Sequence, residues 1–430
     1  MLRAFANAFK IPDLRGKILF TLAIIAVYRF GSFVPTPGVD YEVLREAVRQ
    51  ATVTNVGALI NLFSGGALTQ LAVFALGIMP YITASIIMQL LTVVIPKLEE
   101  WQKEGETGVR KITQITRYLT VVLAILQSTG LIVLIQNGSE QIFGQPVPGL
   151  IPDPSLGTKA LMVLTLTAGT AFIMWLGELI TQRGIGNGMS LLIFAAIVAS
   201  LPGQGSAILR QTNPWFFSLV MFVGLVLVVG VVFVEQGQRR IPVQYAKRQV
   251  GRRVYGGSST YIPLKVNQAG VIPIIFASSL LYLPTLASSI VGSPSLTSFV
   301  DRYFAGGAHP VYVLTYFLLT VFFAYFYTAI TFNPIDVADN MKKYGGFIPG
   351  IRPGRPTAEY LDRVLTRITL PGSLYLATLA VLPFVVLGLA GIEFPFGGTT
   401  LLIVVGVALE TMKQLESQLM QRHYEGFLKS

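Results

Sequence analysis

Ten long runs of apolar residues, separated by shorter polar stretches, make up most of this chain. A helix needs about 20 residues to cross the hydrocarbon core of a bilayer. The candidate runs cover residues 18–34, 71–95, 118–136, 158–177, 189–201, 215–234, 266–291, 310–332, 368–390 and 399–412. Because lipid offers the backbone no hydrogen-bond partners, unbroken runs favour helices over the alternating strands of a barrel. The pattern therefore predicts an all-α membrane protein with ten transmembrane helices.

Two of these runs need separate interpretation. Run 18–34 has the basic flank of a signal peptide, but it contains Arg29 and lacks a small-residue cleavage site. We interpret it as a retained first span, because similar segments recur along the chain. Run 189–201 has only 13 residues, so it either continues into the preceding loop or does not cross the membrane alone.

The composition agrees with a membrane protein. Charged residues supply 12% of the 430 residues, about half the share found in soluble domains. Together with 53% hydrophobic residues, this excludes soluble globular, collagen-like, disordered and purely nucleic-acid-binding classes. The chain has no cysteine, which removes disulfides, thiolate metal sites and cysteine nucleophiles from consideration.

Lysine and arginine fall mainly on one side of the predicted membrane. With alternating spans, 26 of the 32 such residues lie on the side of the two termini, five lie in the opposite loops or at their edge, and Arg29 lies within the first run. The excess of positive charge makes the first side cytoplasmic. An even number of spans then places both termini in the cytoplasm.

The predicted spans contain almost no ionisable residues. Apart from Lys159, the second residue of its run, only Arg29 and Glu410 are charged, and each lies close enough to a helix end to extend its charge toward the interface. Ion-coupled transporters usually keep such groups at midplane depth, so a solute transporter is the less favoured alternative. An intramembrane enzyme is less favoured still, because Walker A and HExxH motifs are absent and His309 and His423 lie outside the runs.

A short apolar segment at about 58–68 is too short to span and is interrupted by Gly65 and Gly66. Non-helical backbone at membrane depth is tolerated only where protein buries it or where it lines a cavity. The segment is therefore a candidate for blocking a channel from within. The alternative is that it forms a helix lying at the membrane surface.

A four-residue pattern recurs in two runs, as Gly77-Ile78-Met79-Pro80 and Gly270-Val271-Ile272-Pro273. Channels and transporters built from inverted halves show weak symmetry of this kind. The match is short enough to arise by chance, so by itself it is a weak indication of two related halves.

Two long connections, 235–265 and 333–367, face the cytoplasm in this topology. The first has partial alternation and Gly256-Gly257, which predict an extended hairpin. Its basic residues lie beside Tyr245 and Tyr255 and suit a phosphate backbone or an acidic protein surface. The alternative is that they only fix topology and contact anionic lipid. They are Arg239, Arg240, Lys247, Arg248, Arg252 and Arg253.

Seven segments resemble the SecY family, the channel-forming subunits of the bacterial Sec protein-translocation complex, and the resemblance covers essentially the whole chain. In chain order they are RFGSFVPTPGVD, LFSGGAL, FALGIMPYITASIIMQLL, RGIGNGMS, GQRRIPVQYAKRQ, PLKVNQAGVIPIIFASS and GGFIPGIRPG. The resemblance implies two pseudosymmetric five-helix halves, 1–212 and 213–430, around a central pore.

The resemblance also implies roles for particular residues. The plug that closes the pore would be Asn61, Leu62, Phe63, Ser64, Gly65, Gly66, Ala67 and Leu68. The narrow ring would be Ile78, Ile82, Ile193, Ile275 and Ile403. The lateral gate toward lipid would include Thr83, Ile87, Ser279 and Leu283, with Ser85 and Ser278 nearby. Arg352 would join the basic hairpin residues in docking SecA or the ribosome.

The partners that the resemblance implies are the small membrane subunits SecE and SecG, the motor ATPase SecA, and the ribosome through its RNA. The substrate would be a polypeptide with a signal sequence, and the setting the bacterial plasma membrane. No cofactor and no catalytic site are expected, because the energy would come from the motor or from the ribosome.

Overall fold

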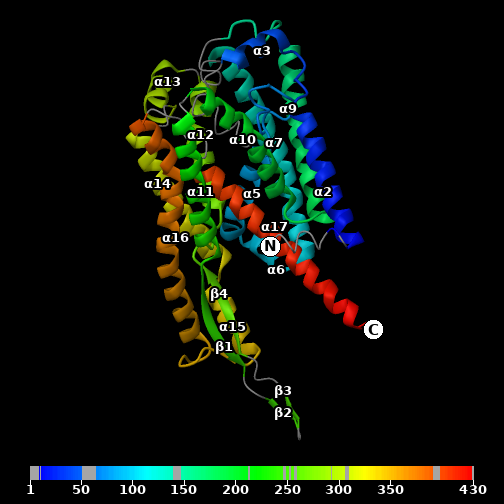
Figure 1. Ribbon diagram of the computed structural model, residues 1–430, viewed down its shortest axis with the longest axis vertical. Coiled ribbons are helices and arrows are strands. Elements are labelled where there is room, and N and C mark those ends of the chain that lie inside the picture. Colours follow the sequence, from blue (N-terminus) through cyan, green and yellow to red (C-terminus); the bar gives the residue numbers. More distant parts are fainter. Residues whose placement is uncertain are drawn as a thin grey trace. The chain divides into compact units, whose positions relative to one another are not determined.

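The computed structural model (Figure 1) describes residues 9, 11–50, 64–138, 147–211, 214–245, 248–250, 253–255, 259–291, 293–305, 309–390 and 398–428. The chain folds into two compact units. The first comprises Met1–Leu219, Ser279–Tyr312 and Ile403–Ser430, and the second comprises Val220–Ser278 and Val313–Leu402. The unit boundaries fall within α11 (Pro214–Gln236), α12 (Ile272–Val291), α14 (Pro310–Thr331) and α17 (Gly398–Leu428).

The other elements belong to one unit each. The first unit contains α2 (Pro12–Gly31), α3 (Tyr41–Gln50), α5 (Met79–Val94), α6 (Pro96–Lys103), α7 (Glu106–Gly138), α9 (Leu156–Arg183), α10 (Gly188–Gln211), α13 (Pro294–Val300) and the π-helix η1 (Asp301–Ala305). The second unit contains β1 (Gln238–Tyr245), β2 (Arg248–Val250), β3 (Arg253–Tyr255), β4 (Ser259–Lys265), α15 (Pro334–Lys343), β5 (Gly346–Phe347) and α16 (Arg355–Ala390).

Each of the ten predicted runs overlaps a helix of the structure. Within the described residues, five helical segments are long and apolar enough to cross a membrane: α7, α9, α11, α14 taken with α15, and α16. The pair α5 and α6 meets at a bend of 100° and makes a sixth candidate, as a broken span or a re-entrant loop. The structure is that of a helical membrane protein, and the count of ten spans stays a prediction.

The short run 189–201 is part of a longer helix. Helix α10 has 24 residues and gains its length after the run, up to Gln211, rather than in the preceding loop. Asn187 fixes its start, because Asn187 Oδ1 accepts hydrogen bonds from the backbone N–H groups of Met189 at 3.1 Å and Ser190 at 3.3 Å. The loop before it therefore cannot join the helix.

Helices of the first unit pack around α7 and α9. Helix α7 contacts α5 and α9, and α9 also contacts α2 and α10. Arg117 on α7 and Glu178 on α9 form a bidentate ion pair, with nitrogen–oxygen distances of 2.8 and 2.7 Å. A Cβ atom at Gly188 would meet the carbonyl oxygen of Gly177, so backbone lies against backbone where α10 follows α9. The bidentate ion pair and the close approach of the two backbones both restrict how these helices pack against each other.

Helices α5 and α12 begin later than the apolar pattern predicts, at Met79 instead of residue 71 and at Ile272 instead of residue 266. The backbone conformation is the cause. Leu71 has φ +41°, Gly77 has φ +56° and Gly270 has φ +62°, values that a right-handed helix does not contain. Residues 71–73 bond instead to residues 34–36, and the N–H of Val266 donates to the carbonyl oxygen of Gly237 at 3.0 Å, next to the β1–β4 ladder.

The recurring Gly-aliphatic-aliphatic-Pro pattern has the same local structure in both places. Gly77 has φ +56° and Gly270 has φ +62°, conformations that favour glycine. Each glycine lies two residues before its helix, and Pro80 or Pro273 is the second helical residue. Proline is well tolerated in the first turn, because its missing N–H has no partner there. The two segments therefore share a local backbone structure as well as a sequence pattern.

The predicted extended hairpin is confirmed in the second unit. Strand β1 pairs antiparallel with β4, and β2 pairs antiparallel with β3 (Figure 1). Strand β5, from the other long connection, pairs with the end of β1 at Gln244 and Tyr245. The inner face of the hairpin packs into an apolar cluster with α15 and α16, formed by Ile241, Val243, Leu264, Met341, Ile348, Leu361 and Val364. The two long connections thus form one body.

Candidate functional site

The described part of the candidate plug, residues 64–68, lies against two helices of the first unit. Tyr28 Oη on α2 donates to the carbonyl oxygen of Ser64 at 3.4 Å, and Arg29 Nη1 donates to that of Gly65 at 2.7 Å. A Cβ atom at Gly65 would lie 2.9 Å from Cα of Ala196 on α10. The segment is therefore held between α2 and α10. Asn61, Leu62 and Phe63 lie outside the described residues.

The chain beyond the plug is tied to the end of α2. Thr36 N–H donates to the carbonyl oxygen of Leu71 at 2.9 Å, and Val73 N–H donates to that of Val34 at 2.8 Å. The ring of Phe74 then stacks on Tyr28 with centroids 5.9 Å apart. These bonds make a short antiparallel pairing that keeps residues 71–74 in place beside α2.

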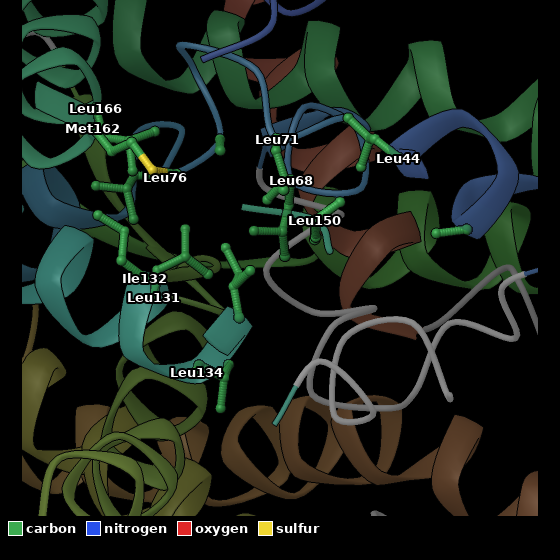
Figure 2. Packing of buried hydrophobic residues seen from close by; sticks show 13 residues of the cluster. Leu44, Leu68, Leu71, Leu76, Leu131, Ile132, Leu134, Leu150, Met162 and Leu166 are labelled. Atoms are coloured by element: carbon green, nitrogen blue, oxygen red, sulfur yellow. The ribbon is translucent and has the colours of Figure 1, made fainter. Parts of the chain in front are cut away.

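Leu68, the last residue of the candidate plug, is an anchor in the core. Figure 2 shows it beside Leu71 and Leu150, in the buried cluster that also contains Leu131 and Met162. Leu68 is fully buried, and its removal to Ala would cost about 2 to 5 kcal/mol. The plug segment therefore starts from a fixed point at its C-terminal end.

The five isoleucines of the candidate ring lie on or next to four helices. Ile78 caps the start of α5, Ile82 lies in its first turn, Ile193 lies on α10 and Ile403 on α17, all in the first unit. Ile275 lies on α12 in the second unit. Ile82 is half-buried and the other four are buried. Ile193 precedes Ala196 by three residues, so it shares a face of α10 with the residue that contacts the plug.

The candidate lateral gate lies on α5 and α12. Thr83 Oγ1 donates to the carbonyl oxygen of Met79 at 2.9 Å, and Ser278 Oγ donates to that of Ile275 at 2.9 Å, so both hydroxyls bond within their own helix. Ser279 Oγ is buried and has no hydrogen-bond partner among the described residues. Ile87 is half-buried, and the side chain of Leu283 lies outside the description. These hydroxyls do not lock one helix to another.

The candidate docking surface lies on the body formed by the two long connections. Arg239 and Arg240 are exposed on β1, and the guanidinium of Arg240 lies 4.9 Å from the ring centroid of Tyr261 on β4. Arg352 is exposed as well, and its carbonyl oxygen accepts a hydrogen bond of 2.8 Å from Thr357 Oγ1. Lys247 and Arg252 lie outside the described residues, and for Arg248 and Arg253 only the strands that carry them are described.

Sequence reasoning missed the contact between Arg29 and the plug. It placed the Arg29 charge toward the membrane interface, whereas the guanidinium hydrogen-bonds to Gly65. The signal was the presence of arginine in an apolar run, which implies a partner. Among the described residues, no cluster of three or more histidine or acidic side chains could hold a metal ion.

Comparison with known proteins decides the family. The family model of SecY matches residues 72–412. The protein translocase subunit SecY of Streptomyces galbus is 62% identical, with all of both chains covered, and that of Mycobacterium bovis is 56% identical with the same coverage. The chain belongs to the SecY family.

Solved structures agree on the fold. A protein-conducting channel structure matches with a TM-score of 0.65 at 18% identity, covering 93% of this chain and 91% of the other. Sec61 from a canine ribosome–channel complex matches with a TM-score of 0.60 at 16% identity, covering 93% and 91%. As a SecY-family member, the chain is a channel subunit of a protein translocase in a membrane, and it is not an enzyme.

Proposed function

We propose that the ten helices cross the membrane as two related halves, 1–212 and 213–430, around a pore that passes unfolded preproteins. The observation that carries this arrangement is the shared start of α5 and α12, with a left-handed glycine followed by proline in each. Matching Gly/Pro interruptions in two halves point to the transport pathway. In this arrangement Ile78, Ile82, Ile193, Ile275 and Ile403 form the ring, and residues 61–68 form the plug.

The physical demands on such a pore fit these residues. A pore for chains of every sequence cannot bind any one side chain tightly, so its narrowest ring should be apolar and deformable, and should exclude ions by dewetting. An apolar segment of the translocating chain must also leave sideways into lipid. It passes through a seam between two helices that side-chain packing closes and that can open. Thr83, Ile87, Ser279 and Leu283 form this seam in the proposal. The internally bonded hydroxyl of Thr83 supports it, because it allows close approach without a strong lock.

The exposed basic body is the docking surface for the energy source in this proposal. Arg239, Arg240, Lys247, Arg248, Arg252 and Arg253 would contact ribosomal RNA, and Arg352 would serve SecA. The related Sec61 structure is a ribosome–channel complex, which supports the ribosome contact by analogy. SecE and SecG would accompany the chain, and signal-bearing preproteins would be its substrate. The Streptomyces and Mycobacterium relatives favour a bacterial plasma membrane.

The orientation of the chain can be tested with single cysteines, because the native sequence has none. Ser155→Cys and Ser295→Cys lie on the proposed outer side and should react with an impermeant thiol reagent added outside intact cells. Gln249→Cys and Tyr344→Cys lie on the proposed cytoplasmic side and should react only after the membrane is opened. The reverse pattern would contradict both the orientation and the cytoplasmic docking surface.

A further inference from the structure

Arg29 is a charged residue in the last turn of α2, the first span of the proposed topology, where it needs a partner. Its guanidinium Nη1 donates a hydrogen bond of 2.7 Å to the carbonyl oxygen of Gly65, and the same group lies 5.2 Å from the ring centroid of Phe33. A hydrogen bond from a charged donor is about twice as strong as a neutral one. The plug backbone is thus the hydrogen-bonded partner of this charge.

The fit of Gly65 to this place is tight. Its φ is +63°, and a Cβ atom would lie 2.9 Å from Arg29 Nη1 and 2.9 Å from Cα of Ala196. Glycine alone lets the carbonyl approach both helices so closely. The adjacent carbonyl, of Ser64, accepts a bond from Tyr28. Two successive plug carbonyls are therefore satisfied by two successive side chains of α2.

The rest of the described segment is fixed at its C-terminal end. Leu68 is buried in the core, and residues 71–73 are paired with residues 34–36. Gly66 has φ +90°, and a Cβ atom there would have open space around it. Within the segment, the N–H of Leu68 donates to Ser64 Oγ at 3.2 Å and Thr69 Oγ1 donates to the carbonyl oxygen of Gly66 at 2.9 Å, so residues 64–69 hold together locally. The two bonds from α2 join this local turn to a helix.

We propose that Arg29 is a positioning residue that holds the plug in its seated place through the carbonyl of Gly65. This rests on the proposed function of residues 61–68 as a plug. Because the acceptor is the main-chain oxygen of a glycine, the hydrogen bond needs no side chain at position 65. Loss of the donor favours the unseated plug and raises the resting leak of the channel, while Leu68 keeps the segment attached.

The test is the resting ion conductance of the purified, reconstituted translocase complex in planar bilayers. Arg29→Met keeps the length of the side chain and removes its donors, and it should raise resting conductance about tenfold. Arg29→Lys retains a charged donor and should restore most of the seal. Arg45→Met, at an exposed position on α3, is the matched control and should conduct like the native channel.

A second background separates this inference from the plug itself. In a channel lacking residues 61–68, Arg29→Met should add nothing, because its acceptor is gone. If the deletion leaks but Arg29→Met in the full chain does not, the plug stands and the role of Arg29 is overturned. If Arg29→Met adds the same leak in both backgrounds, or if Arg29→Lys leaks as much as Arg29→Met, the inference is also overturned. If the deletion itself does not leak, the proposed plug fails.

Discussion

Deletion of residues 61–68, or replacement of Ile82 by Asn, is expected to raise the resting ion conductance of the reconstituted channel by about tenfold or more, because an apolar constriction excludes ions by dewetting. Asn in the ring offers hydrogen bonds to water and so wets the narrowest part of the pore. The same variants should accept preproteins with weakened signal sequences, since less energy is needed to open a channel that is already loosened. Planar-bilayer recording and an export assay measure the two effects.

Ile82→Leu is the matched control for the ring, because it changes shape and keeps the position apolar at the same volume. It should leave the resting conductance close to the native value. An unchanged leak in both the deletion and Ile82→Asn would show that plug and ring are misassigned. A leak of equal size in Ile82→Leu would show that packing, and not the apolar character of the ring, controls the seal.

Arg352→Glu is expected to abolish SecA-driven export while resting conductance and membrane insertion of the subunit stay normal. Arg352 is exposed on the second unit, and arginines of this kind often carry much of a docking interface, with losses of about thirtyfold or more on replacement. ATP-driven translocation of a model preprotein into vesicles measures the effect. Arg355→Glu, three residues away and also exposed, is the control with the same charge change and should export normally.

Reversal of charge at Arg252 and Arg253 should act on the other partner. Ribosome binding should weaken and its salt dependence should become shallower, because fewer phosphates are neutralised. If Arg352→Glu leaves export intact or opens a leak, Arg352 is not a motor-coupling residue. If the Arg252 and Arg253 variant binds ribosomes as tightly as the native chain, the basic residues have only a topological role.

Much of the fold was predictable, because its signals are local. Each apolar run located a helix, and the partial alternation located the β1–β4 hairpin. The late start of α5 was not predictable, because residues 71–73 bond to a segment more than thirty residues earlier in the chain. The pairing of β5 with β1 involves only two residues of β5, too few to form a sequence pattern.

The candidate site was also predictable only in part. Gly65 and Gly66 marked the break, and both have positive φ. On the acceptor side of the contact between Arg29 and Gly65, the sequence shows a glycine but not which side chain donates to its carbonyl oxygen. The sequence could show that Arg29 needed a partner, but only the folded chain shows which backbone group accepts its hydrogen bond.

The path of the translocating chain tests the central claim most directly. Photo-crosslinking residues are placed singly at Ile82, Ile193 and Ile403 of the ring, and at Leu164 on α9 and Leu225 on α11, which are 68% and 62% exposed. A preprotein is then arrested part-way through the reconstituted channel by a folded C-terminal domain. The account predicts crosslinks from the three ring positions and none from Leu164 or Leu225. Crosslinks from the two exposed positions without any from the ring would contradict a pore at these isoleucines.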